Sequence, residues 1–331
     1  MTGGTEAQMA TVDWVAADWG TSHLRLWLIG RDGRVIDRLD SDRGMASLAP
    51  EGYEPEILRL IGDRLPAGGV LPVICCGMAG ARQGWAEAPY VAVPAAPPGL
   101  AEARRVATRD PRLTVFILPG MKQQAPAEVM RGEETQIAGF LAAEPDFDGV
   151  LCLPGTHCKW VHISAGEVVS FRTAMTGELF ALLGTQSVLR HSLGTTGWDD
   201  AAFAAAVNEA MAQPAALAFN LFSLRARSLL SGLAPETARA RLSGLLIGME
   251  LAAARAYWLG RAVVILAEGG IASAYGAALA AQGAAPRAVD AEEMTLGGLR
   301  AARATLGGPD AAGTTLGGLD AAGATPGKDR T

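Results

Sequence analysis

Hydrophobic and polar positions alternate over the first 40 residues in the manner of a β-meander. The stretch from Trp14 to Ala17 is a short apolar run, and Leu24, Leu26 and Leu28 then recur at every second position. An Asp-Gly turn follows, and the run VIDR returns from it. Since period-two alternation puts one side of a strand on a core, we expect three antiparallel strands here.

Strand-like and helix-like patterns then follow one another. We expect a helix around Pro55–Leu65 and buried strands at LPVICC and RLTVFILPG, each of which ends in a turn that contains glycine. Residues Glu134, Ile137, Ala138 and Leu141 have helical spacing, so a second helix begins near Gly132. The first third of the chain therefore reads as mixed α/β.

A second unit, VLCLPGTHCKWVHISAGEVVSFRT, has the same order of strands and turns as the opening one. Both units are of similar length, and both carry Gly-Thr in a turn. This internal similarity predicts two structurally duplicated domains. Beyond it, the chain from about Thr176 to Trp258 is rich in Ala and Leu and reads as helical, and AVVILAEGG reads as a buried strand that leads into another helix.

These patterns predict three regions. The first lobe spans 1–133, the second spans 134–290, and a last helix at 291–303 packs back on the first lobe. Residues 304–331 form a ten-residue repeat of Gly, Ala and Thr without aromatic side chains. Such a composition buries too little apolar surface to fold, so we expect a disordered tail.

Composition narrows the function classes. The 331 residues are 50% hydrophobic with a net charge of −6, which argues against nucleic acid as a partner. No apolar run reaches the roughly 18 residues of a membrane span, and the first residues do not resemble a signal peptide. The four cysteines form no CxxC pair, so we expect buried free thiols, no zinc site and a cytoplasmic protein.

The first turn of the chain, Asp18-Trp19-Gly20-Thr21-Ser22, has the composition of a phosphate-binding loop. Successive backbone N–H groups in a tight turn bind phosphate oxygens, glycine permits close approach, and hydroxyls add donors. A carboxylate beside a polyphosphate indicates an intervening Mg²⁺, so Asp18 is the candidate metal ligand. Taken alone, the motif is also compatible with an ordinary surface turn.

Two further glycine turns make the nucleotide interpretation more specific. Gly155, Thr156 and His157 lie in the equivalent turn of the second unit, and two such loops would face each other across a cleft. Gly269 and Gly270 stand between a strand and a helix, where a bare backbone can approach an adenosine closely. The order hairpin, hairpin, strand–Gly-Gly–helix predicts an ATP site between two lobes.

That order is similar to the actin/hexokinase/Hsp70-like ATPase superfamily, and especially to its carbohydrate kinases. The resemblance implies two ribonuclease-H-like α/β lobes around a nucleotide cleft. It also implies that an acid in MRGEETQIAGFL is the catalytic base, where the sugar kinases have Asp. Glu134 aligns best through the Ala-Gly that follows, and Glu133 is the alternative.

Seven blocks together resemble the 2-dehydro-3-deoxygalactonokinase family over roughly residues 12–303. They are DWGTSHLRLWL, GMAGARQGW, APYVAVPA, MRGEETQIAG, PGTHCKWV, FRTAMTGEL and SGLLIGME. The resemblance implies an ATP-dependent kinase that phosphorylates the C6 hydroxyl of 2-dehydro-3-deoxy-D-galactonate in galactonate breakdown.

A substrate with a carboxylate and a keto group requires fixed cations, and a bidentate Arg suits a carboxylate best. The candidates beside the motifs are Arg82, Arg131, Lys159 and Arg172. Two alternatives stay open at this point: a kinase of another sugar or sugar acid, and a non-catalytic actin-like nucleotide sensor. The sequence also leaves the oligomeric state open, a homodimer included.

Overall fold

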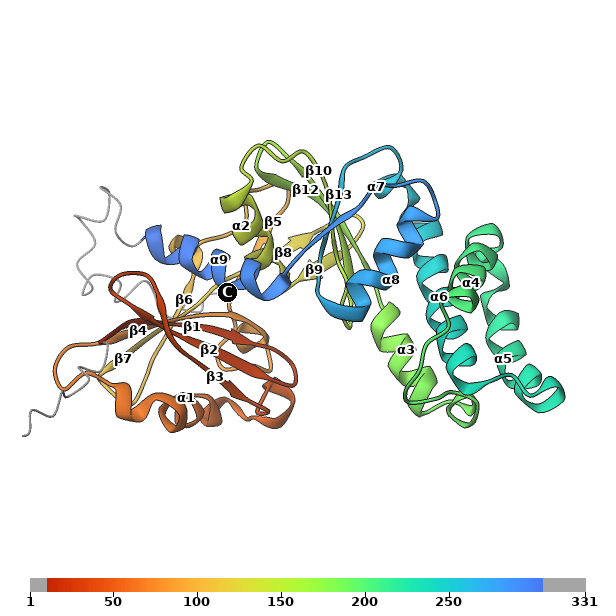
Figure 1. Ribbon diagram of the computed structural model, residues 1–331. Coiled ribbons are helices and arrows are strands. Elements are labelled where there is room, and N and C mark those ends of the chain that lie inside the picture. Colours follow the sequence, from red (N-terminus) through yellow and green to blue (C-terminus); the bar gives the residue numbers. More distant parts are fainter. Residues whose placement is uncertain (1–10, 306–331) are drawn as a thin grey trace, which may run out of the picture.

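Two α/β lobes and a projecting group of helices make up the protein in this computed structural model, which describes residues 11–305 (Figure 1). The predicted tail, 304–331, lies almost entirely outside the described residues. The two-lobed α/β fold that the sequence predicts is confirmed. No helix among the described residues is long and apolar enough to cross a membrane.

The first lobe is built on a six-stranded sheet with the order β3-β2-β1-β4-β7-β6. β1 pairs antiparallel with β2 and parallel with β4, so the carboxyl ends of β1 and β4 lie at the same edge of the sheet. The strands are β1 (Val12–Trp19), β2 (Leu24–Gly30), β3 (Val35–Ser41), β4 (Leu71–Gly77), β6 (Arg104–Val106) and β7 (Leu113–Ile117).

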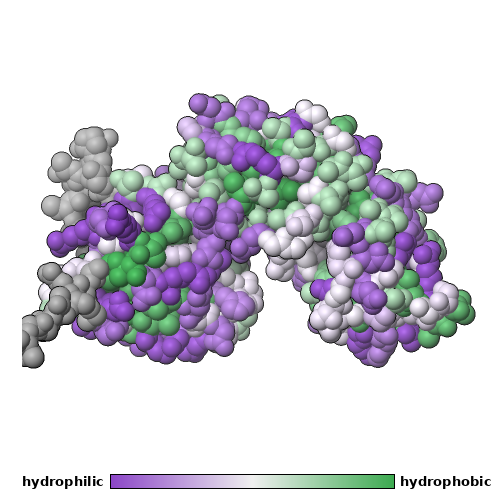
Figure 2. Space-filling view, in the orientation of Figure 1, coloured by the Kyte–Doolittle hydropathy of each residue, from purple (hydrophilic) through white to green (hydrophobic). Residues whose placement is uncertain are grey.

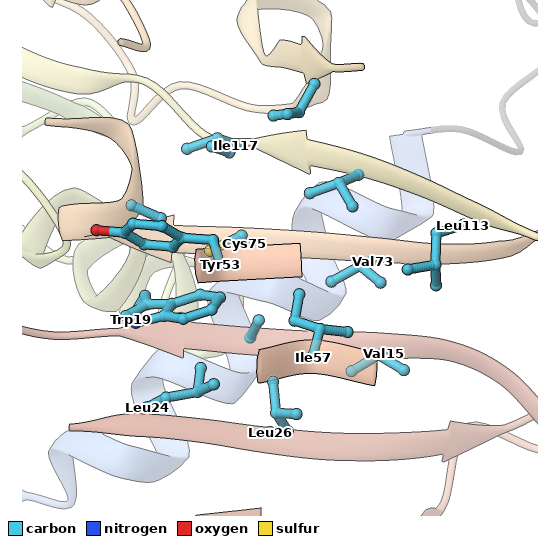
Figure 3. Packing of buried hydrophobic residues seen from close by; sticks show 14 of the residues in the cluster. Val15, Trp19, Leu24, Leu26, Tyr53, Ile57, Val73, Cys75, Leu113 and Ile117 are labelled. Carbon is cyan, nitrogen blue, oxygen red and sulfur yellow. The ribbon is translucent and has the colours of Figure 1, made fainter. Parts of the chain in front are cut away.

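Helix α1 (Tyr53–Ile61) covers one face of this sheet. Its Tyr53 and Ile57 are fully buried against Trp19 and Val15 of β1, as Figure 3 shows. The rings of Trp19 and Tyr53 are 4.5 Å apart. The aromatic cluster therefore anchors the end of β1, where the first predicted phosphate loop begins.

The second lobe repeats the strand order of the first, as β12-β11-β10-β13-β14. β10 pairs antiparallel with β11 and parallel with β13, as β1 does with β2 and β4. The strands are β10 (Gly149–Leu153), β11 (Cys158–Ser164), β12 (Glu167–Ala174), β13 (Val263–Leu266) and β14 (Arg287–Val289). The two opening β-units of the sequence are thus equivalent elements of two similar sheets.

A group of helices belongs to the second lobe and projects away from the first (Figure 1). α4 packs along α6, and α5 packs on α6 from the outer side. The helices are α3 (Thr176–Thr185), α4 (Asp200–Ala212), α5 (Leu217–Ser231), α6 (Pro235–Ala253), α7 (Arg255–Trp258) and α8 (Gly269–Ala280).

Two helices, α2 (Glu133–Ala143) and α9 (Ala291–Ala304), pack closely against each other. A Cβ on Gly139 would lie 1.9 Å from the carbonyl oxygen of Met294, and one on Gly298 would lie equally close to Thr135 O. Only glycine permits this close approach of the two backbones. α9 also packs on the first sheet, where Leu299 joins the cluster of Trp14 and Ile74.

A small third sheet is formed by β5 (Tyr90–Ala92), β8 (Gly120–Gln123) and β9 (Glu128–Met130). Its Met121 and Met130 share a core with Phe171 of β12. A segment within the predicted first lobe therefore packs on the second, and the boundary at residue 133 stays a prediction. The four cysteines are free and buried, as the sequence predicts.

Candidate active site

The two predicted phosphate loops meet at one cavity of about 470 Å³. Gly20, Thr21 and Ser22 come from the turn after β1, and Thr156 comes from the turn after β10. Asp18, at the end of β1, also lines this cavity. The complete lining is Asp18, Gly20, Thr21, Ser22, His23, Arg25, Asp40 and Thr156.

Residues 41–46 support the first loop from below. The carbonyls of Gly20, Thr21 and Ser22 accept hydrogen bonds from the N–H groups of Met45, Ala46 and Gly44, at 3.1, 2.9 and 3.2 Å. These carbonyls are thus satisfied within the protein, and the exposed Thr21 and Ser22 line the cavity. That arrangement is suitable for binding an anion.

The Asp18 carboxylate is held by an ion pair and a thiol hydrogen bond. Its Oδ2 lies 2.5 Å from Nη2 of Arg25, and Arg25 also pairs with Glu292 of α9 at 3.2 Å. Its Oδ1 accepts a hydrogen bond from the Cys76 thiol at 3.7 Å. Burial raises the pKa of Cys76 well above its usual range, so the thiol keeps its proton.

Asp18 fits the way in which proteins usually hold Mg²⁺ with a nucleotide. That ion is bound through one or two carboxylates together with substrate phosphates and waters. Asp18 supplies one carboxylate at a cavity lined by two glycine loops. The described residues contain no group of three or more His, Cys, Asp or Glu that would hold a metal without a substrate.

The second loop rests on the amino end of α3. Thr156 O accepts the backbone N–H of Glu178 at 2.9 Å, and Nε2 of His157 lies 2.7 Å from Oε2 of the same glutamate. A Cβ on Gly177 would lie 2.2 Å from Gly155 O, so glycine is required where the helix meets the loop. The segment MTGEL is thus a structural partner of the loop.

A buried carboxylate, Glu250 of α6, fixes this helix end in place. It accepts hydrogen bonds from Trp160 Nε1 at 2.7 Å, from Tyr275 OH at 2.8 Å and from Thr176 Oγ1. These donors come from β11, α8 and the first residue of α3. Glu250 is only 3% exposed, so all four elements are tied together beneath the second loop.

A larger cavity of about 710 Å³ adjoins the second loop. Gly155 lines it on one side, and Gly270, at the start of α8, lines it on another. The neighbouring Gly269 has a φ of +61°, the left-handed conformation that favours glycine. Other lining residues are Thr176, Gly177, Phe180, Trp198, Arg239 and Tyr275.

The acid pair at the start of α2 has two different environments. Glu134 is 1% exposed, and both its oxygens lie 2.8 Å from the Gly132 N–H. Burial, together with the charge of Glu133, raises the pKa of Glu134 to about 7. The Glu133 side chain is 24% exposed, and its Oε1 lies 2.9 Å from Nζ of Lys159.

The four predicted substrate cations lie in different surroundings. Lys159 is buried in its pair with Glu133, and the Arg131 guanidinium stacks on Tyr90 with 4.2 Å from Cζ to the ring centre. Arg82 has 81% of its side chain exposed and lies 3.6 Å from Glu87. Arg172 pairs with Glu128 of β9 at 2.9 Å. The structure therefore brings Arg131 and Lys159 beside the acid pair.

Several residues at this site were not expected from the sequence. Arg25 and Gly177 stand within the motif blocks DWGTSHLRLWL and FRTAMTGEL, which was an available signal. Glu250 interrupts an apolar stretch of the region that we read as helical, and the isolated charge could have marked it. Glu292 reaches Arg25 from the last helix, and no local pattern indicates that contact.

Known proteins of one family resemble this chain over nearly its whole described length. The sequence model of the 2-keto-3-deoxy-galactonokinase family matches residues 18–302. A protein of Rhizobium meliloti (strain 1021), named a probable 2-dehydro-3-deoxygalactonokinase, is 43% identical over 89% of this chain and 98% of its own. The 2-dehydro-3-deoxygalactonokinase of Escherichia coli (strain K12) is 33% identical over 88% and 97%.

A crystal structure of a Sinorhizobium meliloti protein named for the same activity superposes with a TM-score of 0.82. It is 41% identical, and the match covers 88% of this chain and 96% of that one. With the family model and both relatives spanning nearly all the described residues, the chain belongs to the 2-keto-3-deoxy-galactonokinase family.

Proposed function

We propose that this protein is an ATP-dependent kinase that phosphorylates 2-dehydro-3-deoxy-D-galactonate on its C6 hydroxyl. One observation carries the proposal: residues from both lobes line the same cavity. These residues are Gly20, Thr21 and Ser22 of the first lobe and Thr156 of the second. The family and its relatives supply the identity of the sugar acid.

One nucleotide would span both cavities. Thr156 lines the smaller cavity and the adjacent Gly155 lines the larger, so the two adjoin at the second loop. The phosphates would bind between the loops, and adenosine would occupy the larger cavity beside Gly270. Bound Mg²⁺, held by Asp18 directly or through water, would neutralise phosphate charge.

Access distinguishes the two candidate bases. A general base must come within hydrogen-bond reach of the hydroxyl, and Glu133 is the acid with exposed surface beside the second-loop strand. Nζ of Lys159 lies 2.9 Å from its Oε1 and holds the carboxylate in place. We therefore assign the base to Glu133, although the sequence alignment favours Glu134. Glu134 is fully buried and its pKa is raised to about 7, so we assign it a structural role, in which its carboxylate accepts a hydrogen bond from the Gly132 N–H.

The reaction then balances as an in-line transfer. The C6 oxygen forms a bond to the γ-phosphorus while the bond from that phosphorus to the β–γ bridging oxygen breaks. The C6 hydroxyl proton passes to the Glu133 carboxylate, and ADP leaves with the bridging oxygen. Binding between the loops would supply positioning and charge stabilisation for this step.

The decisive experiment is an ADP-release assay with ATP and Mg²⁺ on a panel of acceptors. The panel holds 2-dehydro-3-deoxygalactonate, its gluconate epimer, glycerol and xylulose. Turnover confined to the galactonate compound is expected. Turnover on a neutral sugar alone would contradict the substrate, and tight ATP binding without turnover on any acceptor would favour the nucleotide sensor.

Glu133→Gln should lower kcat by about 10²–10⁴-fold with ATP affinity retained, because it removes the base without removing phosphate contacts. Glu134→Gln is the matched control, since it makes the same change one residue away. The assignment is reversed if Glu134→Gln abolishes turnover while Glu133→Gln stays active. Calorimetric titration with ATP checks that both variants keep the nucleotide site.

Arg82 is the predicted cation with the greatest freedom to bind the substrate carboxylate, because it is exposed and its pairing with Glu87 is loose. Arg82→Ala should raise KM for the sugar acid by about 10–100-fold, as expected for a lost charged hydrogen bond. Arg172→Ala is the control. Equal KM values for the two variants would show that Arg82 does not bind the substrate carboxylate.

A further inference from the structure

Helix α5 carries apolar side chains on two opposite faces. Leu217, Leu221 and Leu224 pack inward on the cluster that includes α6, and Leu224 is fully buried. The outer face presents Phe219, Phe222, Leu229 and Leu230, which are 81%, 64%, 67% and 87% exposed. A contiguous apolar surface that is left exposed usually marks an interaction site.

The four exposed residues and the partly buried Ala226 recur at helical spacing and form one stripe, the α5 stripe, composed of Phe219, Phe222, Ala226, Leu229 and Leu230. At about 1.5 Å per residue the stripe is roughly 16 Å long. Figure 2 shows hydrophobic side chains at this outer end of the helical group, where α5 lies in Figure 1. Val188, on a short helix that contacts α5, is 48% exposed and adds to the apolar surface.

We propose that the α5 stripe is the contact between two copies of this chain, with α5 packed antiparallel against α5 of the second copy around a two-fold axis. In that arrangement Phe219 lies opposite Leu230 of the second copy, and the small Ala226 lies near the axis, where the backbones approach most closely. Large side chains at both ends and a small one in the middle make the stripe complementary to itself, as a two-fold contact requires.

The exposed area matches what such a contact needs. With about 200 Å² for a phenylalanine and slightly less for a leucine, the four large side chains expose roughly 550 Å² per chain. Two copies would bury roughly 1,100 Å², and rim residues would add to it, so the contact exceeds the ~1,000 Å² expected of a biological interface. A patch of this size is also at the upper end for a monomer.

Charge favours a second copy over a membrane surface. Residues 213–234 contain two arginines and no acidic residue, whereas a membrane-surface helix is typically rich in Lys and Arg. The chain as a whole carries a net charge of −6, which disfavours anionic lipid. Helix α5 also lies at the outer end of the helical group, away from the first lobe (Figure 1), so pairing leaves the interlobe cavity open.

Sedimentation equilibrium over a wide range of protein concentration tests the proposal. The wild-type chain should show twice the 34.2 kDa of a single chain, and Phe222→Glu should show the single-chain mass with unchanged circular dichroism and kcat. Leu259→Glu, at a side chain that is 60% exposed and outside the stripe, should stay paired. A single-chain mass for the wild type, or a Phe222→Glu variant that still pairs, overturns the proposal.

Cross-linking supplies a test that does not depend on a disruptive charge. The four native cysteines are buried, so an introduced surface thiol reacts selectively. Ala226→Cys should give a covalent two-chain product with a short bifunctional thiol reagent, and Leu259→Cys should not. Equal yields from the two variants would exclude an axis at the α5 stripe.

Discussion

The two glycine loops of this protein occupy equivalent places in two sheets of the same strand order, yet they differ in charge and in support. The first loop follows a carboxylate, Asp18, that pairs with Arg25 and through it with Glu292. The second follows Pro154 and has no acid within its turn; its nearest carboxylate, Glu178, belongs to the helix below. The two lobes therefore share the strand arrangement that carries the loops, but the charged residues beside the loops differ.

Each loop rests on a segment held by a buried glutamate. In the first lobe Glu56 of α1 accepts from Ser41, Arg43 and Arg59, and Ser41 and Arg43 adjoin the residues that bond the first loop. In the second lobe Glu250 accepts from three neutral donors beneath the second loop. The support around Glu56 includes ion pairs, whereas the donors around Glu250 are all neutral. A change of pH or a substitution should therefore affect the two supports differently.

The largest effect is expected at the charge that distinguishes the loops. Asp18→Asn should lower kcat by about 10²–10³-fold, since it removes the carboxylate that we propose holds Mg²⁺ without changing the shape of the side chain. Asp40→Asn is the matched control, because Asp40 lines the same cavity with 54% of its side chain exposed. If steady-state rates fall equally in both variants, or in neither, Asp18 has no special role and does not distinguish the first loop from the second.

The ionic support should show itself in acid. Hydrogen bonds from Arg59, Ser41 and Arg43 lower the pKa of Glu56 from 4.5 to about 2. A lowered folded-state pKa adds stability that is present above about pH 4.5 and is lost as pH falls toward 2. Since both arginines are about half exposed, water screens the pair, and we expect a contribution of about 1–2 kcal/mol at neutral pH.

Glu56→Gln should therefore unfold more easily in urea at pH 7 by about that amount, and the difference from wild type should shrink below pH 4.5. Glu51→Gln, at an exposed site nearby, should match wild type at every pH. A Glu56→Gln deficit that stays constant into acid would mean that shape rather than charge supports the first loop.

The smallest effect concerns the contact between α3 and the second loop. Gly177→Ala should raise KM for ATP by about tenfold, because its Cβ would displace Gly155. Gly184→Ala, on the same helix, meets nothing nearer than a leucine side chain at 3.7 Å and should leave KM unchanged. If initial-rate measurements give the two variants the same KM, α3 does not position the second loop.

Local patterns were sufficient for most elements of the fold. Period-two alternation placed the strands from Val12 to Ser41, and the repeated β-unit indicated two lobes before any contact was known. Helical spacing placed α2, and the last helix was expected at 291–303, close to the bounds of α9. These features can be predicted locally because the spacing of apolar residues within a strand or helix indicates which side of it faces a core. No local sequence pattern indicates that the segment 90–130 contributes strands to both lobes.

The sequence by itself determined the two glycine loops, the acid pair and the family resemblance, because each depends on residues close together in the chain. Only the tertiary structure decided that Lys159 pairs with Glu133, that Glu292 reaches Arg25, and that Glu250 lies beneath the second loop. These contacts join residues that are distant in the chain, and their burial sets which carboxylate is accessible and which has a raised pKa. Such properties arise when separate elements exclude water from one another.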